Sequence, residues 1–594
     1  MKSHFTPILL LLFFSLNLKA DVISWNGGVG SWDDPTSWDA GTVPSLVDTA
    51  FIGSGSLANI PSGLHTVKHL IVEGTLLIDA AATLVISNAT ETGLYIGGIL
   101  RNSGTLLITG TGLYAIECEG NFVNLAGATF IADSCERGVL TEPGSIIRNS
   151  GQMLVDEINH RAFEVDGYFL NRAGGLIDVL HTSGIWFEGG FDNYGTVTIT
   201  NSSKIAISCI NCDCINEVGA RITVDSAGLQ GIYTTQLFRN KGIIKIVDAE
   251  KDLLYSYTGT FQNGTTGEIT LEGASETGIK MVLSNFENRG QVVLEASLTQ
   301  NAMELQTSSL DNIGELLLQS TAPTVVDDIS FLYNHPCATL QLKDSLINGN
   351  YIDNEGWLRY HSDKPFSNSE LFYNSGVIED LNGNFDITTL TTHTGIHLAP
   401  IAGPATVGVP LPNALGLGSL ANFTIYNDDW YTAEDLLTPA GDYDPLLNEF
   451  TPSAAADGLS TFYLGIRDVA NSCNEIFQIA VVGGVVAGPV RPPSGPLGGN
   501  GLVVAHQEPE AVEVFPNPAA ERFEVRSTVP FAQPLHLAIY DSQGRQLVSQ
   551  TLAAAGQRRV EVNLDARLPA GMYWLRIAEE GQAPRTLRLV INLL

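Results

Sequence analysis

The stretch Phe191-Asp-Asn193-Tyr-Gly195-Thr-Val197-Thr-Ile199 is one copy of a pattern that recurs through the middle of the chain. An apolar residue comes two positions before an asparagine, glycine often follows two positions after it, and a strand of alternating apolar residues comes next. The asparagine recurs at intervals of 20 to 25 residues, at Asn102, Asn124, Asn149, Asn171, Asn193, Asn216, Asn240, Asn263, Asn288, Asn312, Asn334, Asn354 and Asn374. A fixed period of linked apolar, turn and strand positions indicates a solenoid.

The length and alternation of the repeat select the type of solenoid. It is too short for paired helices, and its apolar positions recur with period 2 rather than 3.6. We therefore predict a right-handed parallel β-helix with coils of about 23 residues. We expect the asparagines to adopt the left-handed backbone region at tight corners and to hydrogen-bond from coil to coil. The alternative, chance turns in an ordinary sandwich, is disfavoured because three linked positions repeat together.

An internal aromatic column is a second expectation from the repeat. The apolar residue before the asparagine is most often phenylalanine, as at Phe122, Phe169, Phe191, Phe238, Phe261, Phe286 and Phe372. Each ring would bury a large apolar area inside the coils.

Composition and charge restrict the partners. The chain has 594 residues, with 30 Lys and Arg against 64 Asp and Glu, and its net charge is −34. This charge repels nucleic acid and anionic membrane surfaces, and we expect no nucleic acid among the partners. It is compatible with cation binding or with solubility outside the cell.

The first 20 residues are expected to be a secretory signal peptide. Lys2 precedes an apolar stretch from Ile8 to Leu16, and Ala20 offers a small residue for cleavage. The apolar stretch is too short to span a membrane, so we expect no transmembrane segment in the mature chain. The protein is therefore predicted to leave the cytoplasm.

The chain between the signal peptide and the last 84 residues divides by composition. We expect an N-terminal cap over residues 21–65, the β-helix over 66–398, an immunoglobulin-like β-sandwich over 399–483 and a linker rich in proline and glycine over 484–510. The β-sandwich at 399–483 loosely resembles the immunoglobulin-like modules of secreted bacterial surface proteins.

Three tryptophans mark the cap. Trp25, Trp32 and Trp38 lie in a segment rich in glycine and aspartate, and the series resembles the opening of many secreted bacterial β-helix proteins. A cap is expected because an exposed coil presents an unpaired strand edge. Stacking of the tryptophans on carbohydrate is the alternative.

Seven cysteines leave the disulfide connectivity open. Cys209, Cys212 and Cys214 have a spacing that superficially resembles a metal site, but no second cysteine pair or histidine knuckle accompanies them. Packing or a disulfide is the favoured interpretation. Cys473 has no partner inside its own module.

The last segment, residues 511–594, resembles the C-terminal sorting domain of the type IX secretion system of Bacteroidetes. The resemblance rests on four spaced motifs, whose defining residues are Pro516, Asn517, Pro518, Asp541, Gly544, Gly571 and Tyr573. It implies that the segment is a β-sandwich, that the type IX machinery is a partner, and that the chain crosses the periplasm and the outer membrane. The domain would then be removed, with release or attachment at the cell surface. The terminal Ile591-Asn-Leu-Leu departs from the lysine that the family often places there.

One group of carboxylates is the candidate site on the β-helix. Counted back from the repeat asparagine, Glu119, Asp166 and Glu188 fall at one offset, while Glu117, Glu164 and Trp186 fall at another. The intervening residues are apolar, so these six side chains should face outward on one sheet. They could bind calcium or a glycan, or supply an acid and base pair. The alternative is an acidic face that is merely solvated.

We therefore interpret the chain as a secreted or cell-surface β-helix protein, non-enzymatic, that acts in adhesion, matrix contact or glycan binding. No catalytic residue is assigned, because the Asp pair, Gly-His-Gly and Arg-x-Lys of the glycoside hydrolases with this fold are missing from the coils. A polysaccharide lyase or glycoside hydrolase that uses the acidic outer sheet is the alternative. A third hypothesis makes the β-helix a stalk for the module at 400–483.

Overall fold

The structure is a computed structural model that describes residues 21–327, 329–401, 405–407, 411–412, 423–425, 429–434, 436–444, 449–486, 512–515, 522–527, 531, 533–540, 546–554, 557–563, 568, 571–579 and 585–591. These described residues form strands and short 3-10 turns and contain no α-helix. The chain divides into two compact units, residues 1–488 and 489–594. The predicted signal peptide and nearly all of the predicted linker lie outside the described residues.

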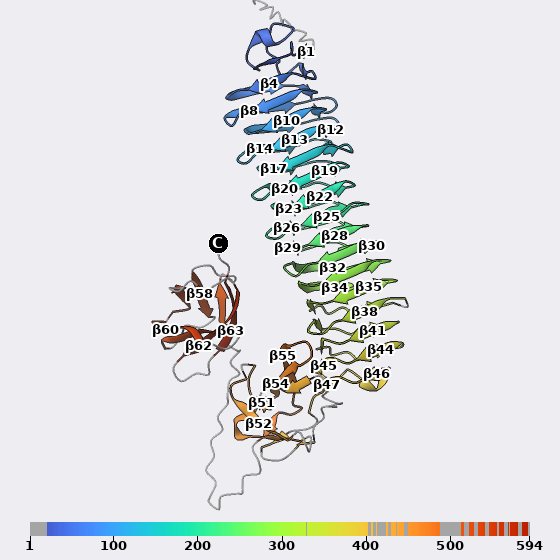
Figure 1. Ribbon diagram of the computed structural model, residues 1–594, viewed down its shortest axis with the longest axis vertical. Helices are drawn as coiled ribbons and strands as arrows, with labels where there is room; N and C mark the ends of the chain where they lie inside the picture. Colours follow the sequence, from blue (N-terminus) through green and yellow to red (C-terminus); the bar gives the residue numbers. More distant parts are fainter. Residues whose placement is uncertain are drawn as a thin grey trace, which may run out of the picture. The chain divides into compact units, whose positions relative to one another are not determined.

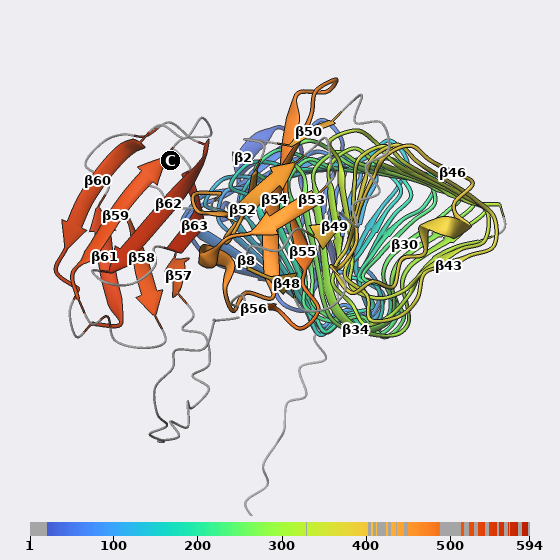
Figure 2. The same cartoon turned by 90° about the horizontal axis from the view of Figure 1, so that it is seen from below.

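The first unit is built around a parallel β-solenoid (Figure 1). In a typical coil, β10 (Ile99–Asn102), β11 (Thr105–Thr109) and β12 (Tyr114–Cys118) lie in three sheets, which we call the first, second and third sheet. Each strand pairs in parallel with the equivalent strand of the next coil, so that Asn102 lies beside Asn124. The end-on view shows the coils superimposed on one another (Figure 2). The predicted parallel β-helix is confirmed.

The strands discussed below fall into these sheets. The first sheet includes β2 (Val29–Ser31), β13 (Asn121–Asn124), β19 (Tyr168–Asn171), β31 (Thr260–Asn263), β33 (Asn285–Asn288), β35 (Ser309–Asn312), β38 (Phe331–Asn334), β41 (Tyr351–Asn354), β44 (Leu371–Asn374) and β46 (Thr392–His393). The second includes β14 (Thr129–Asp133), β17 (Gln152–Asp156), β20 (Leu176–Leu180), β23 (Thr196–Thr200) and β26 (Arg221–Val224). The third includes β1 (Val22–Ser24), β15 (Arg137–Thr141), β18 (Phe163–Val165), β21 (Ile185–Phe187), β24 (Ile207–Cys209), β27 (Ile232–Thr234) and β30 (Asp252–Tyr257).

The thirteen repeat asparagines form a buried hydrogen-bond ladder. Each side-chain amide from Asn102 onward donates to Oδ1 of the asparagine in the next coil, over 2.6–2.9 Å, as far as Asn374. The amide of Asn102 also donates to the carbonyl of Thr129, and its Oδ1 accepts from the backbone N–H of Gly104. A buried amide with donors and acceptors satisfied in this way avoids the cost of desolvation.

The expected left-handed conformation of these asparagines is wrong. None of the thirteen has a positive φ, and neither does the glycine that follows at Gly104. The glycine is needed for close backbone approach instead, because a Cβ there would lie 2.3 Å from the carbonyl oxygens of Asp79 and Ala82 in the preceding coil. The asparagine is selected for its amide rather than for its backbone freedom.

The phenylalanines pack inside the solenoid as predicted. All seven are buried, and rings touch where two adjacent coils both carry phenylalanine, as at Phe169 and Phe191. Phe238 and Phe261 stack with centroids 5.0 Å apart, and Phe261 meets Phe286 edge-on at 5.7 Å. Their apolar area forms much of the core of the first unit.

The N-terminal tryptophans form a compact packed cluster. Trp25, Trp32 and Trp38 are buried, their rings meet edge to face at 4.8–5.0 Å, and Nε1 of Trp38 donates to the carbonyl of Trp32. Buried rings leave no face for a sugar, which removes the carbohydrate-stacking alternative. The parallel ladders begin in this segment, at β1 and β2.

An antiparallel sheet follows the solenoid. Its described strands are β49 (Leu411–Pro412), β50 (Phe423–Ile425), β51 (Asp429–Tyr431), β52 (Pro439–Asp444), β53 (Glu449–Pro452), β54 (Thr461–Asp468) and β55 (Cys473–Ala480). A short parallel pair, β48 (Ala405–Thr406) and β56 (Val485–Val486), lies beside them in sequence. This sheet is fastened to the last coils by a disulfide between Cys337 and Cys473.

The second unit contains two antiparallel sheets. One holds β57 (Val512–Phe515), β58 (Arg522–Ser527) and β61 (Arg559–Asn563), and the other holds β59 (Leu535–Tyr540), β60 (Gln546–Leu552), β62 (Gly571–Glu579) and β63 (Arg585–Ile591). Side chains of both sheets, such as Phe523 and Leu575, share one core. Two sheets around one core agree with the predicted C-terminal β-sandwich.

Candidate functional site

The six predicted site residues lie on the third sheet and its margin, with the expected parity. Their side chains are partly or fully exposed, whereas the alternating residues between them are buried, namely Ile116, Cys118, Phe163, Val165, Ile185 and Phe187. Glu164 pairs in register with Trp186 of the next coil. The outward face that the alternation indicates is therefore present.

The structure separates the six residues into two groups. Leu140 stands between Glu117 and Glu164, since each is its partner in the ladder. Glu117 accepts from the hydroxyl of Thr92 over 3.1 Å, two coils away from Glu164. Only Glu164, Asp166, Trp186 and Glu188 come together, while Glu117 and Glu119 belong to an earlier part of the sheet.

Sequence reasoning missed one carboxylate of this surface, Glu142. The backbone N–H groups of Glu119, Glu142, Asp166 and Glu188 each bond to the preceding coil directly after the strand end, so these four carboxylates occupy successive coils. Burial, followed by the charges of Glu188, Glu164 and Glu142, raises the pKa of Asp166. The row is thus an electrostatically crowded edge of the third sheet.

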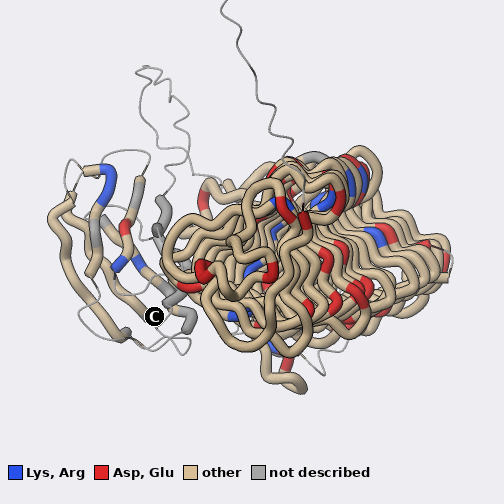
Figure 3. Tube along the Cα trace, turned by 90° about the horizontal axis from the view of Figure 1, so that it is seen from above, with Lys and Arg blue, Asp and Glu red and all other residues tan. Residues whose placement is uncertain are grey.

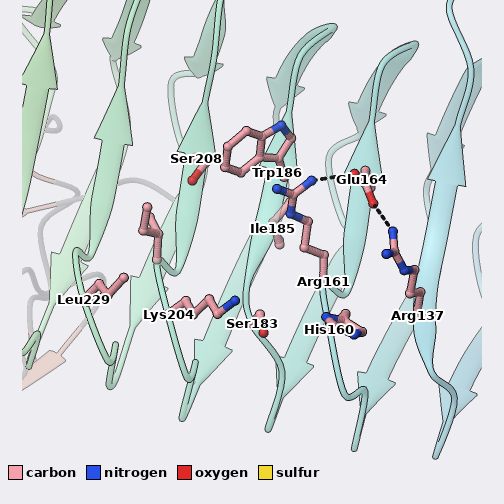
Figure 4. Close-up of a pocket in the computed structure, with 11 residues that line it drawn as sticks. Arg137, His160, Arg161, Glu164, Ser183, Ile185, Trp186, Lys204, Ser208 and Leu229 are labelled. Carbon is pink, nitrogen blue, oxygen red and sulfur yellow. Dashed lines mark hydrogen bonds and ion pairs between the residues drawn. The ribbon is translucent and has the colours of Figure 1, made fainter.

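A hollow of about 370 Å³ opens beside this row, over β15, β18, β21 and β24. Figure 4 shows its lining, in which Glu164 lies between two guanidinium groups and Lys204 extends toward Ser183. The cationic side chains are Arg137, Arg161 and Lys204, and His160 lies on the same rim. Across the coils generally, acidic positions far outnumber basic ones (Figure 3). Three cations on one hollow are therefore a local reversal of the charge of the chain.

Arg161 is held from two sides. Its guanidinium lies 3.8 Å from the ring centre of Trp186 and forms an ion pair with Oε1 of Glu164. The indole Nε1 of Trp186 in turn donates to Glu188 over 2.8 Å. Trp186 and Glu188 thus support an arginine, and the face of the indole toward Arg161 is covered rather than free for a sugar.

The other basic groups differ in how far they are neutralised. Arg137 lies 3.5 Å from Glu164 and donates to the hydroxyl of Tyr114. His160 pairs with Glu136 over 3.2 Å. Lys204 is exposed and forms no ion pair with any residue that the structure describes. The hollow therefore keeps positive charge that its own carboxylates do not balance.

The hollow owes its shape to the corner between the second and third sheets. This corner runs over residues 157–162 before β18, 181–184 before β21 and 201–206 before β24, and its length varies from coil to coil. Glu157, His181 and Asn201, which directly follow the second-sheet strands, have positive φ. Because the corner has no constant length, the basic residues in it have no constant offset from the asparagine, and the repeat did not reveal them.

The carboxylate row does not fit a ready calcium site. Calcium prefers six to eight oxygen ligands around one point. Among the described residues, the only three potential ligand groups that converge are Cys337, Asp468 and Cys473, and both thiols are consumed by the disulfide. Calcium at Asp166 and Glu188 stays a prediction that the row supports by charge alone.

The cysteine cluster is resolved as a disulfide. Cys209 and Cys214 are joined, and Cys212 lies buried beside them with its sulfur 3.9 Å from that of Cys214. Burial raises the pKa of the Cys212 thiol to about 12. A disulfide and a neutral buried thiol agree with the preference for packing over metal binding.

Comparison with known proteins gives one assignment. Residues 513–592 match the family described as the secretion system C-terminal sorting domain. The chain carries a type IX secretion sorting domain. The protein is therefore exported through the type IX machinery to the cell surface or the extracellular space, and that machinery is a partner.

The residues predicted for the sorting motifs are only partly described. Gly571 begins β62, and Tyr573 of the same strand is buried in the core of the second unit. Pro516, Asn517, Pro518, Asp541 and Gly544 lie outside the described residues. No described segment forms a helix that is long and apolar enough to cross a membrane.

The remaining comparisons are local. No curated protein matches the chain. The crystal structure of dimeric latent PorU from Porphyromonas gingivalis is 19% identical over 24% of this chain and 13% of that chain, with a TM-score of 0.13. Immunoglobulin domains 1–4 of Sidekick-1 are 12% identical over 33% of this chain and 48% of that chain, with a TM-score of 0.11.

Proposed function

We propose that this exported protein binds an acidic polysaccharide, one that bears carboxylate or sulfate groups, at the hollow over β15–β24, and that it does so without cleaving it. The observation that carries the proposal is the convergence of Arg137, Arg161 and Lys204 in a chain with 30 basic and 64 acidic residues. Adhesion to an extracellular matrix or to another cell surface would follow from such binding.

The fixed position of Arg161 supports this function. A guanidinium presents N–H groups in a planar fork that matches carboxylate and sulfate oxygens. Contact with Trp186 and Glu164 restrains Arg161 before any ligand arrives. A restrained donor loses less conformational entropy on binding, which favours affinity.

The location on the solenoid suits a polymer. Successive coils repeat at about 4.8 Å, so groups on neighbouring coils form rows parallel to the axis. The cations come from three different coils, since Arg137, Arg161 and Lys204 precede β15, β18 and β24 or begin them. A linear polyanion lying along the axis would meet them in turn.

Binding is tested with ligands that differ only in charge. Affinity electrophoresis of the mature protein in dextran sulfate, polygalacturonate and neutral dextran should show retardation by one or both anionic polymers, and it should weaken as salt rises. The variant R137A/R161A/K204A should lose about tenfold or more of that affinity. The control R101A/R172A/R221A removes three exposed cations from outside the hollow and should bind like the wild type. Equal losses in both variants would refute the assignment of the hollow.

An enzyme is the second candidate, favoured by one observation, the raised pKa of Asp166. A carboxyl whose pKa is raised by burial and by a neighbouring carboxylate is the type of group that serves as a general acid in glycoside hydrolases. Incubation with the same polymers, followed by assays for reducing ends and for unsaturated products, decides the question. New ends that disappear in D166N and E188Q would replace binding by cleavage as the function.

A further inference from the structure

A second exposed surface has the opposite chemistry to the hollow. It covers the outer face of the first sheet over β38, β41 and β44, which follow one another along the solenoid (Figure 1). Its outward residues are Phe331, Tyr333, Tyr351, Asp353, Leu371 and Tyr373. We call these six residues the aromatic face.

The rings of the aromatic face form one contiguous array. Tyr351 lies 5.8 Å from Phe331, 5.6 Å from Tyr333 and 5.5 Å from Tyr373, measured between ring centres. Phe331 is 38% exposed and Leu371 43% exposed. The array therefore presents apolar surface to solvent across three coils.

The fold does not require aromatic residues at these positions. The same outward positions of the two preceding coils hold Asn285 and Glu287 in β33, and Ser309 and Asp311 in β35. Further back, β31 places Thr260 and Gln262 there. The asparagine ladder runs through these polar coils and the aromatic ones alike. The stacking of the coils therefore does not explain why four aromatic rings lie together on this face.

The charges around the array restrict the ligand. Residues 329–335, 349–355 and 369–375 contain no Lys or Arg, and their charged side chains are the carboxylates of Asp353, Glu355 and Glu370. These carboxylates repel a polyanion and accept hydrogen bonds from hydroxyl groups. Aromatic rings offer flat surfaces for the C–H faces of sugar rings.

We propose that the aromatic face is a second glycan-binding site, specific for a neutral polysaccharide with flat sugar rings such as a β-linked glucan. The four rings follow a zigzag along the solenoid axis, because Leu371 and Asp353 occupy the other two places in the two axial rows, and the three coils span about 10 Å. The proposal is independent of the acidic glycan proposed for the hollow.

The test uses substitutions that the chain itself supplies. In the full mature protein, Y333Q/Y351T installs the residues that β31 carries at the equivalent positions, so the coil geometry is preserved. Retardation in gels that contain a soluble neutral β-glucan is expected for the wild type. The affinity for the glucan, calculated from the retardation, should be about tenfold lower in the variant, as expected for the loss of two ring contacts.

Matched controls separate this site from the hollow. Y168T/Y194Q removes two exposed tyrosines elsewhere on the solenoid and should leave glucan binding unchanged. R137A/R161A/K204A should lose only acidic polymers, and Y333Q/Y351T only the neutral one. The two variants therefore test the two proposed sites separately, and one proposal can be refuted while the other is supported.

Three results would overturn the proposal. The first is a wild type that the β-glucan does not retard, and the second is an equal loss in Y168T/Y194Q. The third is a dimer in sedimentation that Y333Q/Y351T dissociates, since the face would then join two copies of the chain. If Y333Q/Y351T melts well below the wild type, the single variant Y333Q and the tyrosine difference spectrum of the wild type on adding glucan replace it.

Discussion

The side-chain amide of Asn374 donates to Nδ1 of His393 over 2.9 Å, so the asparagine ladder ends on an imidazole. The ring must be neutral to accept there. Burial, and to a lesser extent the neighbouring His397, lowers the pKa of His393 below its ordinary value of 6.5. The ladder therefore has an acid-sensitive end.

The first prediction concerns this end. A lowered folded-state pKa means that the contribution of His393 to stability is complete above pH 6.5 and is lost as the pH falls through the folded-state value. His393→Asn would continue the ladder with an amide that does not titrate. Its melting temperature should match the wild type at pH 8 and exceed it by about 1–2 °C at pH 5.5. A larger fall in melting temperature between pH 8 and pH 5.5 for His393→Asn than for the wild type would contradict this prediction.

The second prediction concerns the middle of the ladder. Asn171 donates to Asn193 over 2.8 Å and accepts from Asn149 over 2.9 Å. Asn171→Ala leaves one buried N–H of Asn149 without its acceptor and removes one of the two donors to Oδ1 of Asn193, which should lower the free energy of unfolding by about 2–3 kcal/mol. Asn159→Ala, which removes an exposed amide bonded to Glu136, should cost about 0.5 kcal/mol or less. Denaturant unfolding followed by circular dichroism compares the two, and similar losses would mean that the ladder is not a major source of stability.

The third prediction concerns Asp166. Its pKa is raised, so its share of stability is complete below the ordinary value of 3.8 and is lost as the pH rises through the folded-state value. Asp166→Asn should therefore stabilise the protein at pH 7 by about 0.5 kcal/mol, the size of a surface charge interaction, and have no effect near pH 3. Melting curves at the two values check this. Calcium that stabilises the wild type but not the variant would instead show that the carboxylate row binds the ion.

The fourth prediction compares the two disulfides. Cys337 and Cys473 are separated by 136 residues, whereas Cys209 and Cys214 are separated by five. In the chain-entropy description, the longer loop stabilises by about 5 kcal/mol and the shorter by about 2 kcal/mol. C337A/C473A should expose the strands β49–β55 to limited proteolysis, and C209A/C214A should leave their cleavage rate unchanged. Equal protection of these strands in both variants would argue against the covalent fastening.

Arg359 adds a non-covalent fastening at the same junction. It pairs with Glu475, and its guanidinium donates to the carbonyl of Ile476 over 2.8 Å. Glu379 accepts from the backbone N–H of Gln478. Because these contacts remain in C337A/C473A, we expect proteolysis of β49–β55 in that variant to increase steeply as the temperature rises.

The regular part of the fold could be predicted from sequence because every coil has the same structural requirements at the same positions. A ladder needs the same amide at the same point of every coil, so Asn193 and its twelve equivalents stand out against variable neighbours. The role of the repeat asparagine could not be predicted from its position alone. Asparagine is common in left-handed corners, whereas Asn102 has a negative φ and is used for its side-chain hydrogen bonds.

The candidate site could be predicted only in part. Asp166 and Glu188 share an offset from the asparagine, but Glu142 does not, because its coil has two more residues before Asn149. Arg161 and Lys204 lie in corners of unequal length, so no period includes them. The partner of Cys473 is 136 residues away, and spacing carries no information about such a pair.

Every amide of the ladder donates in the same direction, toward the C-terminal coil. Removing or duplicating one whole coil would consequently leave each remaining donor facing an acceptor. The interval between the hollow near Asn193 and the aromatic face near Asn334 is six such steps, or roughly 30 Å. The distance between the hollow and the aromatic face can therefore change during evolution in steps of one coil, without a change in the interior.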